Sequence, residues 1–404
     1  MSSTLPSSSS HLSTSTKKST FEINVCSFNI RYDSLLDFGN KSWRVRKALV
    51  SKFIQGLSLV PKTNDDVMEE GNSSSYETNE TKKQQQQPST TILHSPLCTL
   101  VGLQEVLQNQ LQDIKNYLSN NNNNNGTDPS IPNNNHNNFG GFTIFSTGRE
   151  AKNGGEHCTI MVKSGSTTNS TNNYSSGTFW LSETPEKPSK YWDAACYRIA
   201  TWVKVPIHIK NDDEKIGETT YHLLYLNTHW DHFSSRACMH SAKLIKNFVK
   251  DQVLMKNSEE NLIGVVVSGD FNCNVEDRAF QELLQPLEIE SERYGKFSLH
   301  FNNSYEYCKK HMLPVLGKET TFNNWSLNNH SSKVTRIDHI LFAEIPCPTT
   351  PHHISLTPTK YECCEGTAEL VTEGSHKKEI IVISDHYPIL VNFSLSITAR
   401  ESTQ

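Results

Sequence analysis

The sequence has neither an excess of positive charge nor a long apolar run. Its 38 Lys and Arg residues face 43 Asp and Glu residues, for a net charge of −5. This balance argues against a protein that coats polyanions, because non-specific nucleic-acid binding depends on many basic phosphate contacts. A local basic groove is not excluded by the count. No apolar run approaches the roughly 18 residues that a membrane-spanning helix needs, so we expect no stable membrane association.

Two further features are missing, an apolar signal-peptide core and paired cysteines at zinc spacing. Residues 1–20 are mostly Ser and Thr, which predicts a protein that is not secreted and is cytoplasmic or also nuclear. The ten cysteines form no CxxC pairs. Several of them, such as Cys26, Cys158 and Cys196, lie within strand-like apolar patterns, so we interpret them as reduced thiols used as small buried side chains.

The low hydrophobic content of 35% has a local origin. Residues 1–20, 61–95 and 119–139 are dominated by Ser, Thr, Asn, Gln and charged residues, including six consecutive Asn at 120–125. Such segments bury too little apolar surface to offset the entropy of ordering. We predict a disordered tail over 1–20, polar insertions at about 61–95 and 119–139, and a single domain over 21–397.

The rest of the chain alternates between strand-like and helix-like patterns. Segments rich in β-branched and aromatic residues predict strands at 21–30, 97–106, 141–148, 157–163, 198–209, 221–229, 262–272, 336–342, 353–358, 379–384 and 388–395. Apolar residues at helical spacing predict helices at 42–57, with Ser42 as its cap, and at 107–118, 233–256 and 275–284. This alternation indicates a mixed α/β fold, in which about eleven strands fit better into two packed sheets than into one.

Polar side chains recur where predicted strands end. They are Asn29, Glu105, His229 with Asp231, Asp270 with Asn272, Asp338 with His339, and Asp385 with His386. In α/β sheets, side chains at strand ends converge on a crevice. Carboxylates and amides without a Cys/His cluster suit Mg²⁺ or Mn²⁺. A divalent cation beside histidines is suited to phosphoryl chemistry, because the cation polarises a phosphate oxygen and the histidines stabilise the growing negative charge.

Each motif has an ordinary structural reading when it stands alone. An Asp-His pair can lie at a surface or in a core, and GDFN (269–272) can be a simple turn at the end of a strand. The functional interpretation rests on the whole set in chain order, with each member at the end of a strand.

That ordered set resembles the endonuclease/exonuclease/phosphatase superfamily of metal-dependent phosphoesterases. The matching segments are SFNIR (27–31), GLQEV (102–106), GEHCTIMVK (155–163), NTHWDH (227–232), GDFN (269–272), RIDHI (336–340) and SDHYPI (384–389). The resemblance implies a four-layer α/β sandwich, in which two mixed β-sheets pack face to face between helices (DNase I-like).

The resemblance also implies roles for individual residues. Glu105 matches the principal metal ligand, with Asn29 beside it and Asp385 as an acidic partner. Asp270 matches the carboxylate that orients the attacking water, and Asn272 is its phosphate-contacting neighbour. The remaining catalytic assignments are His229 and His386 at the scissile phosphate, Asp338 as a second acidic partner, and Glu156 as the group that orients His229. One of the two acidic partners, Asp338 or Asp385, holds a second metal or fixes a histidine tautomer.

A narrower resemblance, to a subgroup near the CCR4/nocturnin-like proteins, bears on the substrate. It rests on FNIRYD (28–33), FWLSETPEKPS (179–189), YWDAACYRIATW (191–202) and the Asp-His of NTHWDH. We assign substrate contacts to Arg198, Arg31, Asp231 and Trp192. The aromatic residues near Arg198, Trp180 and Trp192, are suited to stacking a base, and they are equally suited to a core. Arg198 itself has the alternative of being a surface strand residue.

The leading function predicted from sequence is therefore a Mg²⁺- or Mn²⁺-dependent 3′–5′ exoribonuclease acting on single-stranded RNA. The first alternative is a phosphatase or phosphodiesterase of a small phosphorylated sugar, inositol or nucleotide, and the next is hydrolysis of a lipid headgroup. From another class, a catalytically silent binding module stays open, although every superfamily motif keeps its polar residues.

Overall fold

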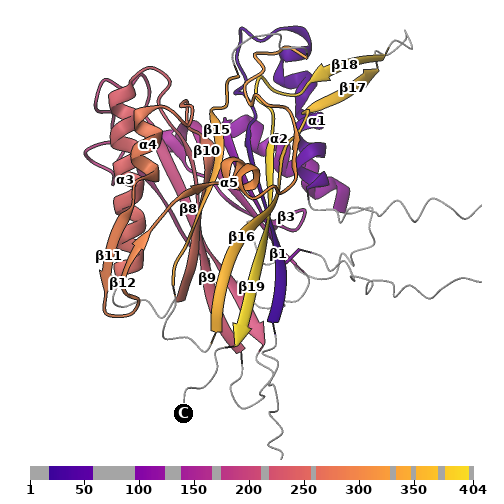
Figure 1. Cartoon of the computed structure of the whole chain (residues 1–404). Helices are drawn as coiled ribbons and strands as arrows, with labels where there is room; N and C mark the ends of the chain where they lie inside the picture. The colour runs from indigo at the N-terminus through magenta and orange to yellow at the C-terminus, as the bar shows by residue number, and fades with distance from the viewer. Residues whose placement is uncertain are drawn as a thin grey trace, which may run out of the picture.

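The computed structural model describes residues 18–57, 96–122, 138–165, 174–210, 218–255, 261–327, 334–346, 352–371 and 378–399. Two large β-sheets pack face to face, with helices at their outer faces (Figure 1). The predicted four-layer α/β sandwich is thereby confirmed.

The first sheet has the strand order β14-β16-β19-β1-β2-β6-β4-β3, with β5 paired to β6. It is mixed, because β1 runs parallel to β2 and antiparallel to β19. Its strands are β1 (Lys18–Asn29), β2 (Cys98–Val106), β3 (Asn138–Phe139), β4 (Phe142–Phe145), β5 (Gly148–Glu150), β6 (Gly154–Ser164), β14 (Val315–Gly317), β16 (His352–Cys363) and β19 (Ile389–Ala399).

The second sheet has the strand order β13-β15-β10-β9-β8-β7. It is mixed too, since β9 and β10 are parallel and their outer neighbours antiparallel. Its strands are β7 (Ser175–Trp180), β8 (Ile199–Lys210), β9 (Glu218–His229), β10 (Asn261–Asp270), β13 (Asn302–Asn303) and β15 (Asp338–Glu344). Two hairpins stand apart from both sheets, β11 (Leu287–Ser291) with β12 (Gly295–Leu299), and β17 (Thr367–Val371) with β18 (Lys378–Val382).

Helices cover the outer faces. Helices α1 (Trp43–Gly56) and α2 (Gln108–Asn122) lie on the side of the first sheet, and α3 (Ser235–Leu254) and α4 (Arg278–Leu284) on the side of the second (Figure 1). Helix α5 (Ser304–Lys310) and two short 3-10 turns, η1 (Gly39–Lys41) and η4 (Ala151–Asn153), complete the described elements. Ser42 precedes α1 as predicted, but its hydroxyl donates to the Gly39 carbonyl and caps no helix N–H.

Strand β1 shows how sequence alternation builds the layers. Ile23 and Val25 belong to the large core that includes the strands of the second sheet, whereas Cys26 and Phe28 belong to the cluster beneath α1 and α2. Successive strand side chains point to opposite faces. The polar side chain that ends the strand, Asn29, therefore points toward the second sheet.

The predicted tail and insertions fall largely outside the described residues. The described chain begins at Lys18, where β1 starts, and it omits 58–95 and 123–137. Helix α2 continues to Asn122 and β3 begins at Asn138, so regular structure enters both ends of the range 119–139. Within the described residues, no helix combines the length and the apolarity that crossing a membrane requires.

Candidate active site

One edge of the sandwich collects the polar strand ends. Strands β1, β2, β9 and β10 reach it with their carboxyl ends, and the antiparallel strand β15 begins there with Asp338. Asp385 and His386 lie just before β19, which is antiparallel to β1. The site residues of both sheets are buried: Asn29, His229, Asp270, Asp338, Asp385 and His386.

Asn29 joins the two sheets at this edge. Its Nδ2 donates to Glu105 Oε1 at 3.0 Å and to Asp270 Oδ2 at 3.0 Å. Its Oδ1 accepts the Arg31 backbone N–H at 2.9 Å. The amide thus holds two carboxylates together, and its oxygen is engaged with the backbone. The metal-ligand role of Asn29 stays a prediction.

Glu105 reaches the site through an irregularity in β2. It has a φ of +59°, and the register with β6 shifts between Leu103 and Val106. Its second oxygen accepts the Tyr32 backbone N–H at 3.0 Å. A non-glycine residue with positive φ is uncommon, and here it lets both Gln104 and Glu105 reach the space between the sheets, where Gln104 contacts Asn227.

Asp270 lies at the centre of the cluster. Its Oδ2 is 3.5 Å from His229 Nε2 and 3.7 Å from His386 Nε2, and its Oδ1 accepts the Asn272 N–H at 3.0 Å. Burial raises the pKa of Asp270 to about 7, with Asp338 adding to the rise and His386 opposing it. A carboxylate with such a pKa is suited to taking a proton from water near neutral pH.

His386 is paired with Asp338. The Nδ1 atom of the ring is 2.9 Å from Asp338 Oδ2. Burial alone would lower the pKa of His386, but Asp338 and Asp270 outweigh it and raise the pKa well above its ordinary value. We therefore expect His386 to be a cation at neutral pH. The other oxygen of Asp338, Oδ1, is buried without a hydrogen-bond partner.

His229 has the opposite surroundings. Its Nδ1 is 3.8 Å from Glu156 Oε2, and that oxygen accepts a 2.8 Å bond from Arg149. Burial lowers the pKa of His229 well below its ordinary value, and the nearby Arg198 and Arg149 lower it further. The pKa of Glu156 is raised, first by burial and then by Glu105. His229 is accordingly neutral at neutral pH.

Arg31 and Asp385 complete the acidic side of the site. The Arg31 guanidinium binds Asp37 at 3.0 Å and approaches Glu105 and Asp385 at 3.9 and 3.8 Å. Burial raises the pKa of Asp385, and Glu105 contributes to the rise. The raised pKa values of Asp270 and Asp385 show that the positive charge around them does not offset the burial of these two carboxylates.

The donor set fits a divalent cation. Ligand atoms of Glu105, His229 and Asp270 lie within 4.8 Å of one another, and so do those of Asp270, Asp338 and His386. Asp270 is common to both groups. The raised pKa of buried Asp270 and the unpartnered oxygen of Asp338 are features that a bound cation would stabilise.

The fold has counterparts among solved structures. An endonuclease/exonuclease/phosphatase family protein from Bacteroides thetaiotaomicron is 23% identical, with a TM-score of 0.57 over 93% of this chain and 98% of that chain. The chain has the fold of the endonuclease/exonuclease/phosphatase proteins. A mannosyl-6-phosphatase from B. thetaiotaomicron and a family member from Bacteroides vulgatus are each 23% identical with TM-scores of 0.55, over 92% of this chain and 99% and 98% of theirs. No family profile and no curated sequence match the chain.

On this family fold, two predicted substrate contacts have mainly internal partners. Asp231 accepts backbone N–H bonds from Ala195 and Cys196 on one oxygen and from Phe233 and Ser234 on the other. Arg198 is buried, with its Nε 3.5 Å from Asp231 and its NH2 2.8 Å from His232 Nδ1. Asp231 thus ties the loop before β8 to the start of α3 and orients Arg198.

The two tryptophans predicted as a base-stacking platform, Trp180 and Trp192, have different surroundings. Trp180 is 9% exposed, packs with Cys158 and Ile199, and donates its Nε1–H to the Arg149 carbonyl. Trp192 stacks on His240 with centroids 4.1 Å apart and donates to Glu183. Trp180 is therefore buried and one face of Trp192 is covered by His240, whereas Tyr197 lines the hollow beside Glu105 and His229 and is 37% exposed.

Sequence reasoning missed Arg149 and Tyr197. Arg149 stands on the short β5–β6 hairpin, in which Gly148 pairs with His157 and Glu150 with Gly154. The spacing of Arg149 and Glu156 across this turn was the available signal. Tyr197 immediately precedes Arg198, and no pattern distinguishes its ring from the other aromatics of the loop.

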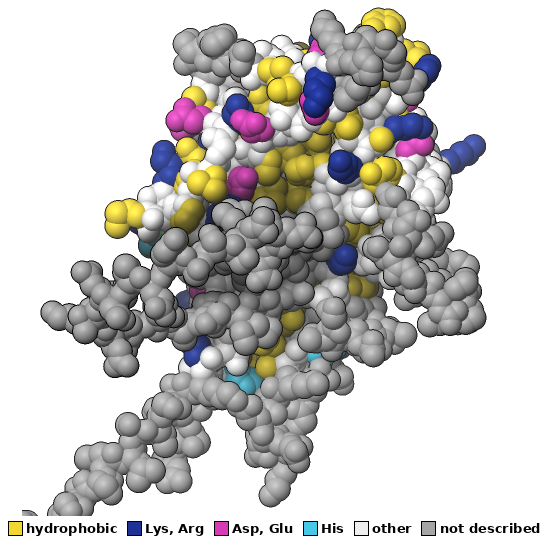
Figure 2. All heavy atoms as spheres, turned by 90° about the vertical axis from the view of Figure 1, so that its right-hand side faces the viewer, with side chains coloured by type: hydrophobic (Ala, Val, Ile, Leu, Met, Phe, Trp, Pro, Cys, Tyr) yellow, Lys and Arg dark blue, Asp and Glu magenta, His cyan; other side chains and the backbone are white. Residues whose placement is uncertain are grey.

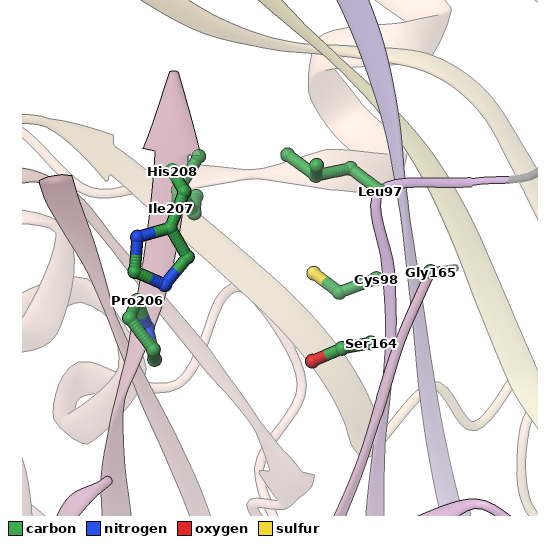
Figure 3. A pocket seen from close by; sticks show the side chains of 7 residues that line it. All are labelled: Leu97, Cys98, Ser164, Gly165, Pro206, Ile207 and His208. Carbon is green, nitrogen blue, oxygen red and sulfur yellow. The ribbon is translucent and has the colours of Figure 1, made fainter. Parts of the chain in front are cut away.

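A second hollow lies elsewhere, at the start of β2. Figure 3 shows Pro206, Ile207 and His208 facing Cys98 and Ser164 across it. Burial raises the pKa of the Cys98 thiol to about 12, and none of the lining residues is a carboxylate. The residues predicted for chemistry all belong to the other end of the strands.

Proposed function

We propose that this chain is a divalent-metal-dependent hydrolase of phosphate esters. The observation that carries the proposal is the bridge from Asn29 to Glu105 and Asp270, with two histidines of unlike charge on Asp270. This arrangement brings together a general base (Asp270), a protonated histidine (His386) and a neutral histidine that can donate a hydrogen bond (His229). It is the set that in-line attack of water on phosphorus requires.

The roles follow from the surroundings of each side chain. Asp270, with a pKa of about 7, orients the attacking water and accepts its proton. His386, held protonated by Asp338, donates to a phosphate oxygen as negative charge develops. His229 contributes a neutral N–H, and Arg198 and Arg149 supply positive charge behind it.

Glu105 would hold the divalent cation, with Asp270 and Asp385 as its acidic neighbours. When bound, such a cation withdraws charge from a phosphate oxygen and so stabilises the transition state. The bridging Asn29 keeps Glu105 and Asp270 at one spacing. Asn272 is held beside Asp270, because its backbone N–H binds Asp270 Oδ1 and its Nδ2 donates to the Trp230 carbonyl.

For the substrate, we favour a small phosphorylated molecule over the 3′ end of RNA. Trp180 and Trp192 are engaged with protein partners, which weighs against the predicted base platform. On the face shown in Figure 2, Lys and Arg side chains of the described residues alternate with Asp, Glu and apolar atoms, without a continuous basic surface. One solved relative in fold is a mannosyl-6-phosphatase, which supports the same direction.

A second candidate, a phosphorylated lipid, is favoured by one loop. Arg31 binds Asp37, and on the same loop Leu35, Leu36 and Phe38 are 93%, 80% and 76% exposed. Apolar side chains presented beside a phosphate site could contact an acyl chain. Exoribonuclease activity is the third reading, with Tyr197 as the remaining exposed ring.

The test is product release from a substrate panel with Mg²⁺, with Mn²⁺ and with EDTA. The panel contains hexose phosphates, inositol phosphates, nucleotides, phosphorylated lipids in vesicles and 5′-labelled poly(A). The wild type is compared with Asp270→Ala and with the matched control Asp277→Ala, which changes a carboxylate near α4 that binds the Asn274 N–H.

We expect metal-dependent release of phosphate from a small ester, lost in Asp270→Ala and kept in Asp277→Ala. Stepwise shortening of RNA with inert small esters would overturn the substrate assignment. Inactivity on all substrates, with intact folding, would overturn the function.

A further inference from the structure

A layer of buried polar side chains lies between the two sheets, below the site. Gln104 Nε2 donates to Asn227 Oδ1 at 2.6 Å and to Ser27 Oγ at 3.2 Å. Ser268 Oγ lies 2.7 Å from Tyr225 OH and 3.4 Å from Asn227 Oδ1. All five side chains are fully buried, in a region where apolar residues would otherwise pack.

Four of the five members of the layer lie one or two positions before a site residue on their own strand, and Tyr225 precedes Asn227 by two positions. Ser27 precedes Asn29 by two positions, Asn227 precedes His229 by two, and Ser268 precedes Asp270 by two. Residues two apart on a strand share a face. Gln104 directly precedes Glu105, whose positive φ brings it to the same side. The layer is therefore the next row of side chains below the catalytic row.

Asn227 is the centre of this layer. Its Nδ2 donates across the sandwich to the Leu103 carbonyl at 2.9 Å and the Thr159 carbonyl at 3.0 Å. Both carbonyls belong to the first sheet, whereas Asn227 belongs to the second. Leu103 and Thr159 are paired in β2 and β6. One side chain thus connects the second sheet to two strands of the first.

The layer has no spare room. A Cβ atom built on Gly102 would lie 2.5 Å from Ser268 Oγ and 2.7 Å from both Asn227 Oδ1 and Tyr225 OH. Apolar packing between sheets is non-directional and tolerates small shifts, whereas hydrogen bonds fix distance and angle. The hydrogen bonds of this buried network therefore favour one relative placement of the sheets, and among its five side chains only Gln104 Oε1 is a buried polar atom without a partner.

We propose that this inter-sheet polar layer is a positioning device for the reaction, with Asn227 as its principal positioning residue. It sets the offset between the sheets, and hence the separation of Glu105 on one sheet from His229 and Asp270 on the other. The inference rests on the proposed function, since it explains how the metal and the catalytic groups keep their spacing. Asn227 touches neither substrate nor metal and acts through the strands.

The experiment compares Asn227→Leu, which keeps the size and removes every hydrogen bond, with the milder Tyr225→Phe. The matched control is Tyr294→Phe, because Tyr294 is also a buried phenol, bonded to the Leu262 N–H at 3.0 Å and remote from the strand ends that form the site. Four quantities are measured on each full-length protein: Tm, Mn²⁺ affinity by calorimetry, and kcat and KM on the best ester of the panel.

Changes to groups that orient metal ligands typically reduce metal affinity or activity by about 10- to 100-fold. We therefore expect Asn227→Leu to lower both Mn²⁺ affinity and kcat by that factor, with little change in KM. Tyr225→Phe should lower kcat by about 3- to 10-fold on the same grounds. Tyr294→Phe should lower Tm while its kcat and Mn²⁺ affinity stay within about 2-fold of wild type.

Two failures are distinguishable. Wild-type protein that binds no Mn²⁺ and hydrolyses no ester would overturn the proposed function. A wild type that does both, beside a folded Asn227→Leu or Tyr225→Phe variant with unchanged kcat and Mn²⁺ affinity, would overturn the positioning role alone. If Asn227→Leu does not fold, Tyr225→Phe against Tyr294→Phe decides the question.

Discussion

The two histidines of the site share one carboxylate and differ in everything else around them. His386 faces Asp338 at 2.9 Å with Asp270 and Asp385 near by, and its pKa is raised. Burial lowers the pKa of His229, and the charges of the nearby Arg198 and Arg149 lower it further. The same residue type therefore serves as a cation on one side of Asp270 and as a neutral donor on the other. Both rings are equally buried. The difference between their pKa values therefore comes from the charged residues other than Asp270 that lie near each ring.

The largest expected effect comes from removing the shared carboxylate. Asp270→Asn should reduce turnover by about 10³-fold, since base and electrostatic contributions are lost together. The folded pKa of about 7, against an ordinary 3.8, means that ionised Asp270 lowers the stability of the metal-free protein as pH rises from about 4 to 7. The variant should thus have a higher Tm than wild type in EDTA at pH 8. A lower Tm would contradict the raised pKa.

Asp338→Asn tests the cationic side. Loss of the negative partner should lower the pKa of His386, so the protonated form is lost at a lower pH. We expect kcat to fall by about 10- to 100-fold and the alkaline limb of the pH–rate profile to move toward acid. An unshifted alkaline limb would show that His386 does not act as the cation, and His386→Gln serves as the reference for complete loss.

Arg149→Met tests the neutral side. Removing this cation, and leaving Glu156 without its 2.8 Å partner, should raise the pKa of His229. The neutral form then needs a higher pH, and the acidic limb should move toward alkali with a loss of about 3- to 10-fold in kcat at pH 7. Lys47→Met, which removes an exposed cation bound to Asp113 on the helices, is the control and should leave the profile in place.

We expect the smallest effect on catalysis from a residue that contacts neither His229 nor His386. Trp192→Leu removes a ring stacked on His240, and we expect less than about 3-fold change in kcat/KM on a small ester, as for most changes away from a site. A loss above 30-fold on poly(A), with small esters unaffected, would restore the base-stacking interpretation of the loop.

The comparison also shows what sequence can and cannot predict. Strand ends were readable because apolar runs stop at polar residues, and this located Glu105, His229, Asp270, Asp338 and His386 at one edge. The charge state of each histidine was not readable, since it depends on Arg149 and Asp338, which lie 80 and 48 positions away. Distances of this kind are set by sheet order, which periodicity does not encode.

Aromatic and amide roles were the least predictable. Trp180 and Trp192 share one loop region in sequence, yet one packs in the core and the other stacks on α3. Asn29 is bound at both ends of its amide, and only the backbone turn at Arg31, with a φ of +58°, determines which end faces the carboxylates. Neither outcome follows from residue type and spacing.

The most direct measurement is phosphate release from the best ester, with Mg²⁺ and with EDTA, for wild type and Glu105→Gln, beside Mn²⁺ affinity for both. Glu105→Gln keeps the size of the side chain and removes the charge that would hold the cation. We expect turnover only with metal, and a loss of about 10²-fold or more in both turnover and Mn²⁺ affinity in the variant. Equal turnover in EDTA, or a Glu105→Gln variant that binds Mn²⁺ and works as well as wild type, would contradict it.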